Sequence, residues 1–364
     1  MNRPSGKLNA ISARIARLLR DVLFSILVFM PYSVLAGEAP QTTPQVVVSI
    51  LPVHSLVSGV MQGVEEPSLI VTGYGSPHTY RMRPSDATKL HNADLVFWIG
   101  GTLETFLRKP LSSLPNNVRV ISLLETEGLI LLENREGGLW EHHTLSSPST
   151  TQNTSDHHIS DPVMKFHGHV HHAHEQAILD NSPGTTESTR LLGYNPHIWL
   201  DPENVKKLVK AISYHLSEVD PIHAAHYQAN EDNLLQRIDK LARKLDKQLS
   251  GLASVPYLVF HDAFLYLEKR YGLQAAGSIT VSPDRMPSAR RITQLRTAMQ
   301  DLDIRCVFQE PQFNTKIIKT ALDGTNARIS TLDPLGVTIE PGPDLWFQVM
   351  NIHSETMVSC LSGL

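Results

Sequence analysis

The 364-residue chain has few cysteines and few aromatic residues, and these shortages limit what it can be. Its 2 cysteines are too few for a disulfide scaffold or for a zinc site made of four cysteines. The formal net charge is −4, and without a long Lys/Arg block this near-neutral charge argues against nucleic-acid binding. Hydrophobic residues make up 41% of the chain, which is enough to form a folded core.

Histidine, in contrast, is abundant and unevenly placed. The chain has 18 His, and half of them fall between residues 141 and 174, within a Ser/Thr/Asn/Pro/Gly-rich stretch from about 134 to 190. Such a composition predicts an insertion with no fixed secondary structure, a mobile loop that offers many weak pairs of ring nitrogens. These histidines are His142, His143, His157, His158, His167, His169, His171, His172 and His174.

The first 36 residues are typical of an export signal. Five basic residues precede an apolar run from Val22 to Val34, and Ala36 stands before the predicted cleavage point. A run of this length, interrupted by Pro31, is too short to cross about 30 Å of hydrocarbon. We therefore expect cleavage after residue 36 and a soluble product in the periplasm of a Gram-negative bacterium.

Export changes the interpretation of the two cysteines. In an oxidising compartment, Cys306 and Cys360 are expected to form one disulfide that ties the end of the chain to a strand. The alternative, a redox site, has no Cys-x-x-Cys spacing to support it.

Short apolar runs alternate with helical segments along the mature chain. We expect strands at 46–50, 69–71, 95–98, 118–121, 257–260, 275–279, 305–308 and 327–332, with helices at 54–60, 84–92, 103–107, 202–216, 263–271 and 288–300. An apolar stripe at helical spacing predicts one long helix over 221–250. The predicted fold is α/β, with two lobes, each a parallel sheet flanked by helices, joined by one long rigid helix. The predicted boundaries are 1–36 for the signal, 37–220 for the N-terminal lobe, 221–250 for the connecting helix and 251–364 for the C-terminal lobe.

Polar residues that follow the predicted strands are candidates for a binding site, because ligands of open α/β sheets gather beyond the carboxyl ends of the strands. His261 and Asp333 directly follow strands, His78 lies in a Gly/Pro turn, and His197 lies just before a helix. A single histidine of this kind is usually a packing or surface residue, which is how we interpret His54 and His91. Three histidines at such positions in an exported chain are stronger evidence.

Several segments resemble a known family. They are Gly75–Asp86 around His78, Asn195–Pro202 around His197, Phe260–Gly272 around His261, and the later Cys306–Phe313 and Thr331–Gly336. Together they are similar to the zinc-uptake solute-binding proteins, the ZnuA-type periplasmic component of a metal ABC importer (cluster A-I). The resemblance covers nearly all of the mature chain and includes the position of the His-rich insertion.

The resemblance implies that zinc is held between two lobes by His78, His197 and His261. Imidazole nitrogens suit zinc, and related manganese carriers have a carboxylate where His261 stands. Many zinc-binding relatives have a Glu immediately before the first ligand, but here this residue is Pro77. The fourth ligand is therefore water, Asp333 or a histidine of the insertion, and Glu310 is expected to orient the structure nearby.

The function implied is a zinc carrier, a monomer that captures Zn²⁺ and passes it to a membrane ABC permease, with no enzyme activity. The insertion is expected to collect zinc at low affinity. One alternative is an exported zinc hydrolase, since three histidines with an open position also make a catalytic site. The chain has no HExxH or GxSxG motif for that chemistry. Another alternative is a metal-dependent adhesin or sequestration protein of the same fold.

Overall fold

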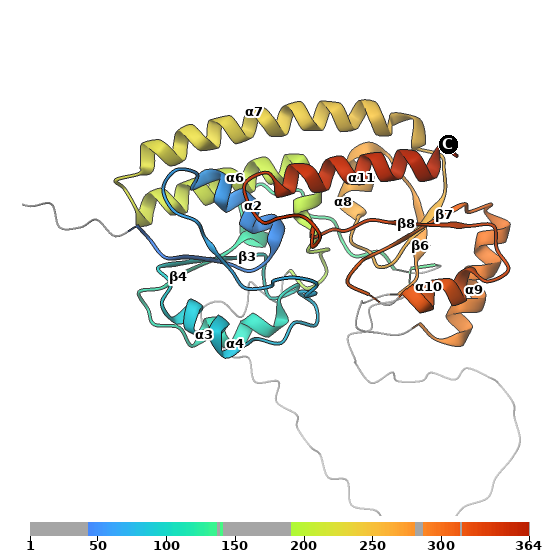
Figure 1. The fold of residues 1–364 in the computed structure, drawn as a ribbon, viewed down its shortest axis with the longest axis horizontal. Helices are drawn as coiled ribbons and strands as arrows, with labels where there is room; N and C mark the ends of the chain where they lie inside the picture. The colour runs from blue at the N-terminus through green and yellow to red at the C-terminus, as the bar shows by residue number, and fades with distance from the viewer. Residues whose placement is uncertain (1–42, 137–138, 141–190, 281–286, 314, 364) are drawn as a thin grey trace, which may run out of the picture. The chain divides into compact units, whose positions relative to one another are not determined.

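Two four-stranded parallel sheets form the framework of the protein (Figure 1). The computed structural model describes residues 43–136, 139–140, 191–280, 287–313 and 315–363. The first sheet has the order β2-β1-β3-β4, from β1 (Val46–Val48), β2 (Ser68–Leu69), β3 (Leu95–Trp98) and β4 (Arg119–Ser122). The second has the order β6-β5-β7-β8, from β5 (Tyr257–Val259), β6 (Ala275–Ser278), β7 (Cys306–Gln309) and β8 (Arg328–Thr331). The predicted α/β class with two parallel sheets is confirmed.

The central strands are short and mostly apolar. All three valines of β1 are buried, and Val47 lies opposite Ser68 on one side and Val96 on the other. Parallel strands that are covered on both faces have continuous apolar runs of this kind rather than alternating ones. Burial on both faces explains why these strands are recognisable in the sequence.

The helices of the first half surround its sheet, and one of them differs from the prediction. A helix was expected at 103–107, but Thr105–Leu107 form a 3₁₀ turn (η1), and the α-helix begins only at Arg108. The α-helices here are α2 (Leu51–Val60), α3 (Pro84–His91), α4 (Arg108–Ser112) and α6 (Pro202–Val219). Asp201 caps α6 by accepting from the Glu203 N–H, and Pro202 fixes its first residue.

The predicted long helix is present as α7 (Ala224–Leu249), at about 39 Å for its 26 residues. Its buried stripe contains Tyr227, Leu234, Ile238, Leu241, Leu245 and Leu249, the residues whose spacing predicts it. Helix α7 packs along α6, α2 and α11 (Figure 1), so it lies against other helices over much of its length.

Two helices of the second half, α10 (Thr315–Leu322) and α11 (Leu345–Leu361), were not predicted, whereas α8 (Leu265–Tyr271) and α9 (Ala289–Asp301) were. Helix α11 contacts α2 and α7 as well as β8. A second helix, besides α7, therefore connects the two halves. The predicted disulfide is confirmed, because Cys360 of α11 is bonded to Cys306 of β7.

One hydrophobic core runs through both halves, and it includes residues of β1, β3, β5 and β7. Buried tryptophans add cross-links, since Trp199 Nε1 donates to the Pro334 carbonyl and Trp346 Nε1 to the Trp199 carbonyl, both at 2.8 Å. The described residues from Thr43 onward accordingly belong to a single compact unit. The predicted signal (1–36) and the nine histidines of the insertion lie outside the described residues. Among the residues that are described, no helix has both the length and the apolar character needed to cross a membrane.

Candidate metal centre

Three histidines from distant parts of the chain meet at the carboxyl ends of the two sheets. His78 lies in the loop between β2 and α3, His197 just before the 3₁₀ turn η3 (Ile198–Leu200), and His261 two residues after β5. One ring nitrogen from each lies within 4.8 Å of the other two. His197 and His261 are buried and His78 is half-buried. Among the described residues this is the one such group that could hold a metal ion.

Hydrogen bonds from the far side of two rings fix their orientation. Asn195 Oδ1 lies 2.9 Å from His197 Nδ1 and 3.0 Å from the His197 backbone nitrogen. The backbone N–H is a donor, so the Asn195 atom that faces it must be the amide oxygen. The Asn195 amide is thereby oriented, and His197 Nδ1 must be the protonated ring nitrogen. His261 Nδ1 similarly donates to Glu310 Oε1 at 2.5 Å. Both rings therefore direct Nε2 toward the centre of the group.

The two Nε2 atoms that face each other have a separation that suits a metal. His197 Nε2 and His261 Nε2 lie 3.2 Å apart. Zinc bonds of about 2.0–2.1 Å in a tetrahedron place neighbouring nitrogens about 3.3–3.4 Å apart. In neutral rings protonated at Nδ1, both Nε2 atoms carry lone pairs, and a buried pair of this kind needs a cation or a proton between them.

The electrostatic environment keeps the central ring neutral. Burial lowers the pKa of His197 well below its ordinary value, and the nearby His261 and His78 lower this pKa further. Burial raises the pKa of the Glu310 carboxyl, and the hydrogen-bonded His261 opposes this effect. A neutral imidazole is the form that binds a metal, so His197 is ready to bind without first losing a proton.

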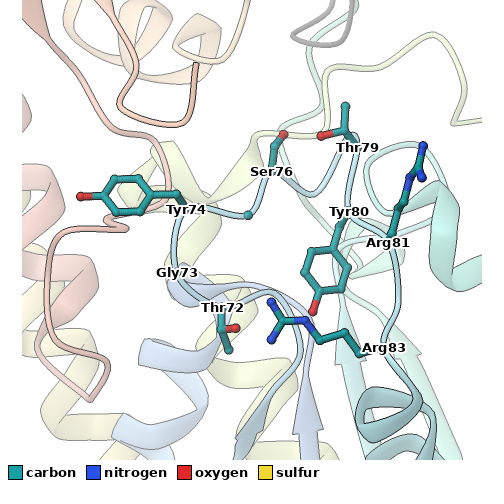
Figure 2. Close-up of a pocket in the computed structure, with 9 residues that line it drawn as sticks. Thr72, Gly73, Tyr74, Ser76, Thr79, Tyr80, Arg81 and Arg83 are labelled. Atoms are coloured by element: carbon teal, nitrogen blue, oxygen red, sulfur yellow. The ribbon is translucent and has the colours of Figure 1, made fainter. Parts of the chain in front are cut away.

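Two cavities adjoin the loop that carries His78. A small one of about 10 Å³ lies against His78 and His197, and Pro77 lines it with a ring that has no ligand atom. A larger one of about 520 Å³ lies along residues 72–83 of the same loop and is lined by none of the three histidines. Figure 2 shows Arg83 and Tyr80 among the residues that line the larger cavity, whereas Tyr74 points away from them. The candidate centre therefore adjoins the small cavity, which two of its three histidines line, and not the larger one.

The structure places Asp333 outside the histidine group. Its Oδ1 accepts from Gln312 Nε2 at 2.8 Å and from the Leu335 N–H at 3.0 Å, and its Oδ2 accepts from the Val337 N–H at 2.6 Å. These bonds cap the turn that follows β8. The geometry thus favours a turn-capping role for Asp333, and its role as a fourth ligand stays a prediction.

Sequence reasoning did not single out Asn195 or Arg135. Asn195 orients His197, and the only sign of it in the sequence is its place two residues before that histidine. Arg135 forms ion pairs with Asp262 and Glu268 and lies 3.5 Å from the centre of the Trp140 ring. Since the two ion pairs join residues that are 127 and 133 positions apart, no local pattern could reveal them.

Known proteins are similar to this chain over most of its length. Residues 46–360 match the family described as zinc-uptake complex component A, periplasmic. The high-affinity zinc uptake system protein ZnuA of Brucella suis biovar 1 is 42% identical over 330 residues, which cover 91% of this chain and 94% of that protein. The protein of the same name from Yersinia pestis is 31% identical, covering 90% and 94%.

Solved structures have the same fold. A crystal structure of ZnuA matches with a TM-score of 0.65 at 22% identity, covering 88% of this chain and 99% of that one. The laminin-binding protein of Streptococcus agalactiae, described as having adhesin and metal-transporting activity, matches with a TM-score of 0.63 at 20% identity, covering 88% and 100%. At these identities the structures bear on the fold alone.

Proposed function

The chain belongs to the zinc-uptake complex component A family, and from this premise we propose that it captures Zn²⁺ in the periplasm and delivers it to the membrane permease of an ABC importer. The proposed zinc ligands are the Nε2 atoms of His197 and His261 and a ring nitrogen of His78. The observation that carries this proposal is the pair of buried Nε2 atoms 3.2 Å apart, each in a ring held from behind by a hydrogen bond.

Neutral imidazoles favour zinc over manganese, which prefers oxygen ligands. The fourth position is water, Asp333 or a histidine of residues 141–174, since Pro77 offers no ligand atom. The core that continues through both halves favours release of zinc through small tilts rather than a wide hinge opening. The disulfide between Cys306 and Cys360 fits an oxidising compartment and an exported chain cleaved after residue 36.

A carrier suits the centre better than a zinc hydrolase does. Catalysis would need a general base beside the metal, but the Glu310 carboxylate already accepts from His261 Nδ1. Among the described residues, the group that could hold a metal contains histidines alone. The adhesin alternative is separated by growth on limiting zinc after gene deletion, and the hydrolase by esterase and peptidase assays of the zinc form.

The test is zinc binding by the exported protein, measured by competition with a chelator and by metal content. We expect one tightly bound zinc in the wild type, a loss of more than 100-fold in affinity in His261→Ala, and no change in His91→Ala. His91 is the control because it is an exposed residue at the end of α3. Wild-type affinity should also fall from pH 7.5 to pH 5 as imidazoles become protonated. Equal affinity in the wild type and His261→Ala would refute the proposed centre.

The histidine-rich residues 141–174 are proposed to collect zinc at low affinity and pass it to the centre. Deletion of these residues should reduce the number of weakly bound zinc ions and slow uptake at limiting zinc, while the tight site remains. Unchanged weak binding and unchanged uptake would contradict this role.

A further inference from the structure

We propose that Asn195 is a positioning residue that couples the two buried histidines, so that its side-chain amide sets the distance between His197 and His261. The inference rests on the proposed zinc-binding function and deepens it. His197 belongs to the first half of the chain and His261 to the second. A residue that holds both would determine how well the centre is formed before zinc arrives.

Each end of the Asn195 amide is bound to a different half. Its Oδ1 accepts from the N–H and Nδ1 of His197, at 3.0 and 2.9 Å. Its Nδ2 donates to the carbonyl of Asp262, the residue after His261, at 2.6 Å. Asn195 is 1% exposed, so water does not compete for these bonds. One planar amide therefore links the ring of His197 to the backbone beside His261.

The backbone of Asn195 is held as firmly as its side chain. Its N–H donates to the Leu132 carbonyl at 2.8 Å, and its carbonyl accepts from the Tyr266 hydroxyl at 2.8 Å. Tyr266 belongs to α8, which starts four residues after His261. Asn195 is thus fixed from both halves, and a shift of one half is transmitted through it to the other.

Asp262, whose carbonyl accepts from Asn195, is itself held by a second residue of the first half. The Asp262 carboxylate accepts from the Arg135 guanidinium, which also donates to Glu268 at 2.5 Å. Asp262, the residue after His261, is therefore held at its carbonyl by Asn195 and at its carboxylate by Arg135. Because both anchors come from the first half, the separation of 3.2 Å between the Nε2 atoms is built into the fold. A preorganised centre binds more tightly, since less ordering remains to be done on binding.

The two functions of the amide can be separated by one substitution. Asn195→Asp keeps an oxygen to accept from His197 but replaces the Nδ2 donor with an oxygen that faces the Asp262 carbonyl. A carboxylate is also the better acceptor for a histidine that binds a metal, because it makes the ring more basic. If Asn195 served His197 alone, Asn195→Asp would bind zinc as tightly as the wild type or more tightly. Coupling predicts instead that Asn195→Asp binds zinc more weakly than the wild type.

A second buried asparagine provides a matched control. Asn204 is fully buried, its Oδ1 accepts from the Ile130 N–H at 2.8 Å, and its Nδ2 donates to the Ile130 carbonyl at 2.9 Å. Asn204→Asp loses the same kind of buried donor without touching a histidine. The pair thus separates an effect on the centre from a general effect on stability.

The experiment measures zinc affinity and the absorption spectrum of bound Co²⁺, which reports ligand geometry, for the exported protein and its variants. We expect Asn195→Asp to bind zinc about 10-fold to 100-fold more weakly, the range for mutating a residue that supports a metal ligand, with an altered Co²⁺ spectrum. Asn204→Asp should match the wild type in both. Zinc affinity in Asn195→Asp equal to or above the wild type would overturn the coupling.

Tyr266→Phe is the second variant, and it decides the matter if Asn195→Asp does not fold. It removes the hydroxyl that donates to the Asn195 carbonyl, and coupling predicts about threefold or greater weakening of zinc binding with the same spectral change. Wild-type affinity and spectrum in Tyr266→Phe would then overturn the coupling. A wild type that binds no zinc would refute the proposed function instead, so the two failures are distinguishable.

Discussion

The carboxyl ends of the two sheets hold similar buried pairs with different partners. In the first sheet, Ser49 follows β1 and its Oγ donates to Glu104 Oε1 at 2.5 Å. In the second, His261 follows β5 and its Nδ1 donates to Glu310 Oε1 at 2.5 Å. Strands β1 and β3 are neighbours, as are β5 and β7. Each pair therefore lies where strand order reverses, the usual place for ligands in such sheets.

The two glutamates differ in what their hydrogen bonds achieve. Glu104 also accepts from the backbone N–H groups of Ile99 and Gly100, both at 3.0 Å, so its bonds close a loop after β3. Glu310 holds a histidine whose other nitrogen faces His197. Both sheets thus place a buried glutamate at the same point of their topology. Its role depends on the residue that follows the neighbouring strand: with Ser49 the carboxylate closes a loop, and with His261 it orients a candidate ligand.

The largest expected difference between the halves is in their covalent support. Strand β7, which precedes Glu310, is tied to α11 by the disulfide across 54 positions. Replacement of both cysteines, Cys306→Ser with Cys360→Ser, should lower the free energy of unfolding by about 4 kcal/mol on the chain-entropy model. Urea unfolding of the metal-free protein measures this loss, and the wild type reduced with dithiothreitol is the control that keeps both side chains. A loss under about 1 kcal/mol would show that the disulfide adds little support to this half.

The next difference concerns pH. Burial raises the pKa of Glu104 from 4.5 to about 7, against the opposing effect of its hydrogen bonds. The folded state then holds this proton more tightly than the unfolded state, so stability falls as pH rises from about 4.5 to 7 and is level above that range. The full shift corresponds to about 3 kcal/mol.

Urea unfolding of the metal-free wild type and Glu104→Gln at pH 5 and pH 8 isolates this contribution. Between the two pH values, the wild type should lose about 2 kcal/mol more stability than the variant, because the glutamine does not ionise. Parallel losses in the two proteins would mean that Glu104 remains charged in the fold at pH 5.

The elements that could be predicted from the sequence are those with a local signal. Strand β3 coincides with the apolar run Leu95–Trp98, and α7 follows its apolar stripe to within three residues at its start. Helix α11 could not be found in this way. It is buried against α2, α7 and β8, so its apolar residues cover several sides and leave no clear amphipathic stripe.

The candidate centre shows the same limit. The structure brings together the three predicted histidines, each of which lies in a motif or after a strand, and their role as zinc ligands stays a prediction. The roles of Asn195 and Glu104 could not be predicted, because their partners Asp262 and Ser49 lie 67 and 55 positions away. Sequence spacing contains no information on which distant backbone carbonyl or hydroxyl a buried side chain meets.

The smallest expected effect comes from replacing the buried glutamate of each half with glutamine, which tests whether the two carboxylates have different roles. Glu310→Gln can still accept from His261 Nδ1, but the ring loses the negative charge that makes it a better ligand, and zinc affinity should fall about 10-fold to 100-fold. Glu104→Gln should leave zinc affinity unchanged, because the bonds of Glu104 go to Ser49 and to the loop after β3 and to none of the three histidines. Chelator competition at pH 7.5 measures both. Equal affinities in the two variants would mean that the negative charge of Glu310 does not strengthen His261 as a ligand.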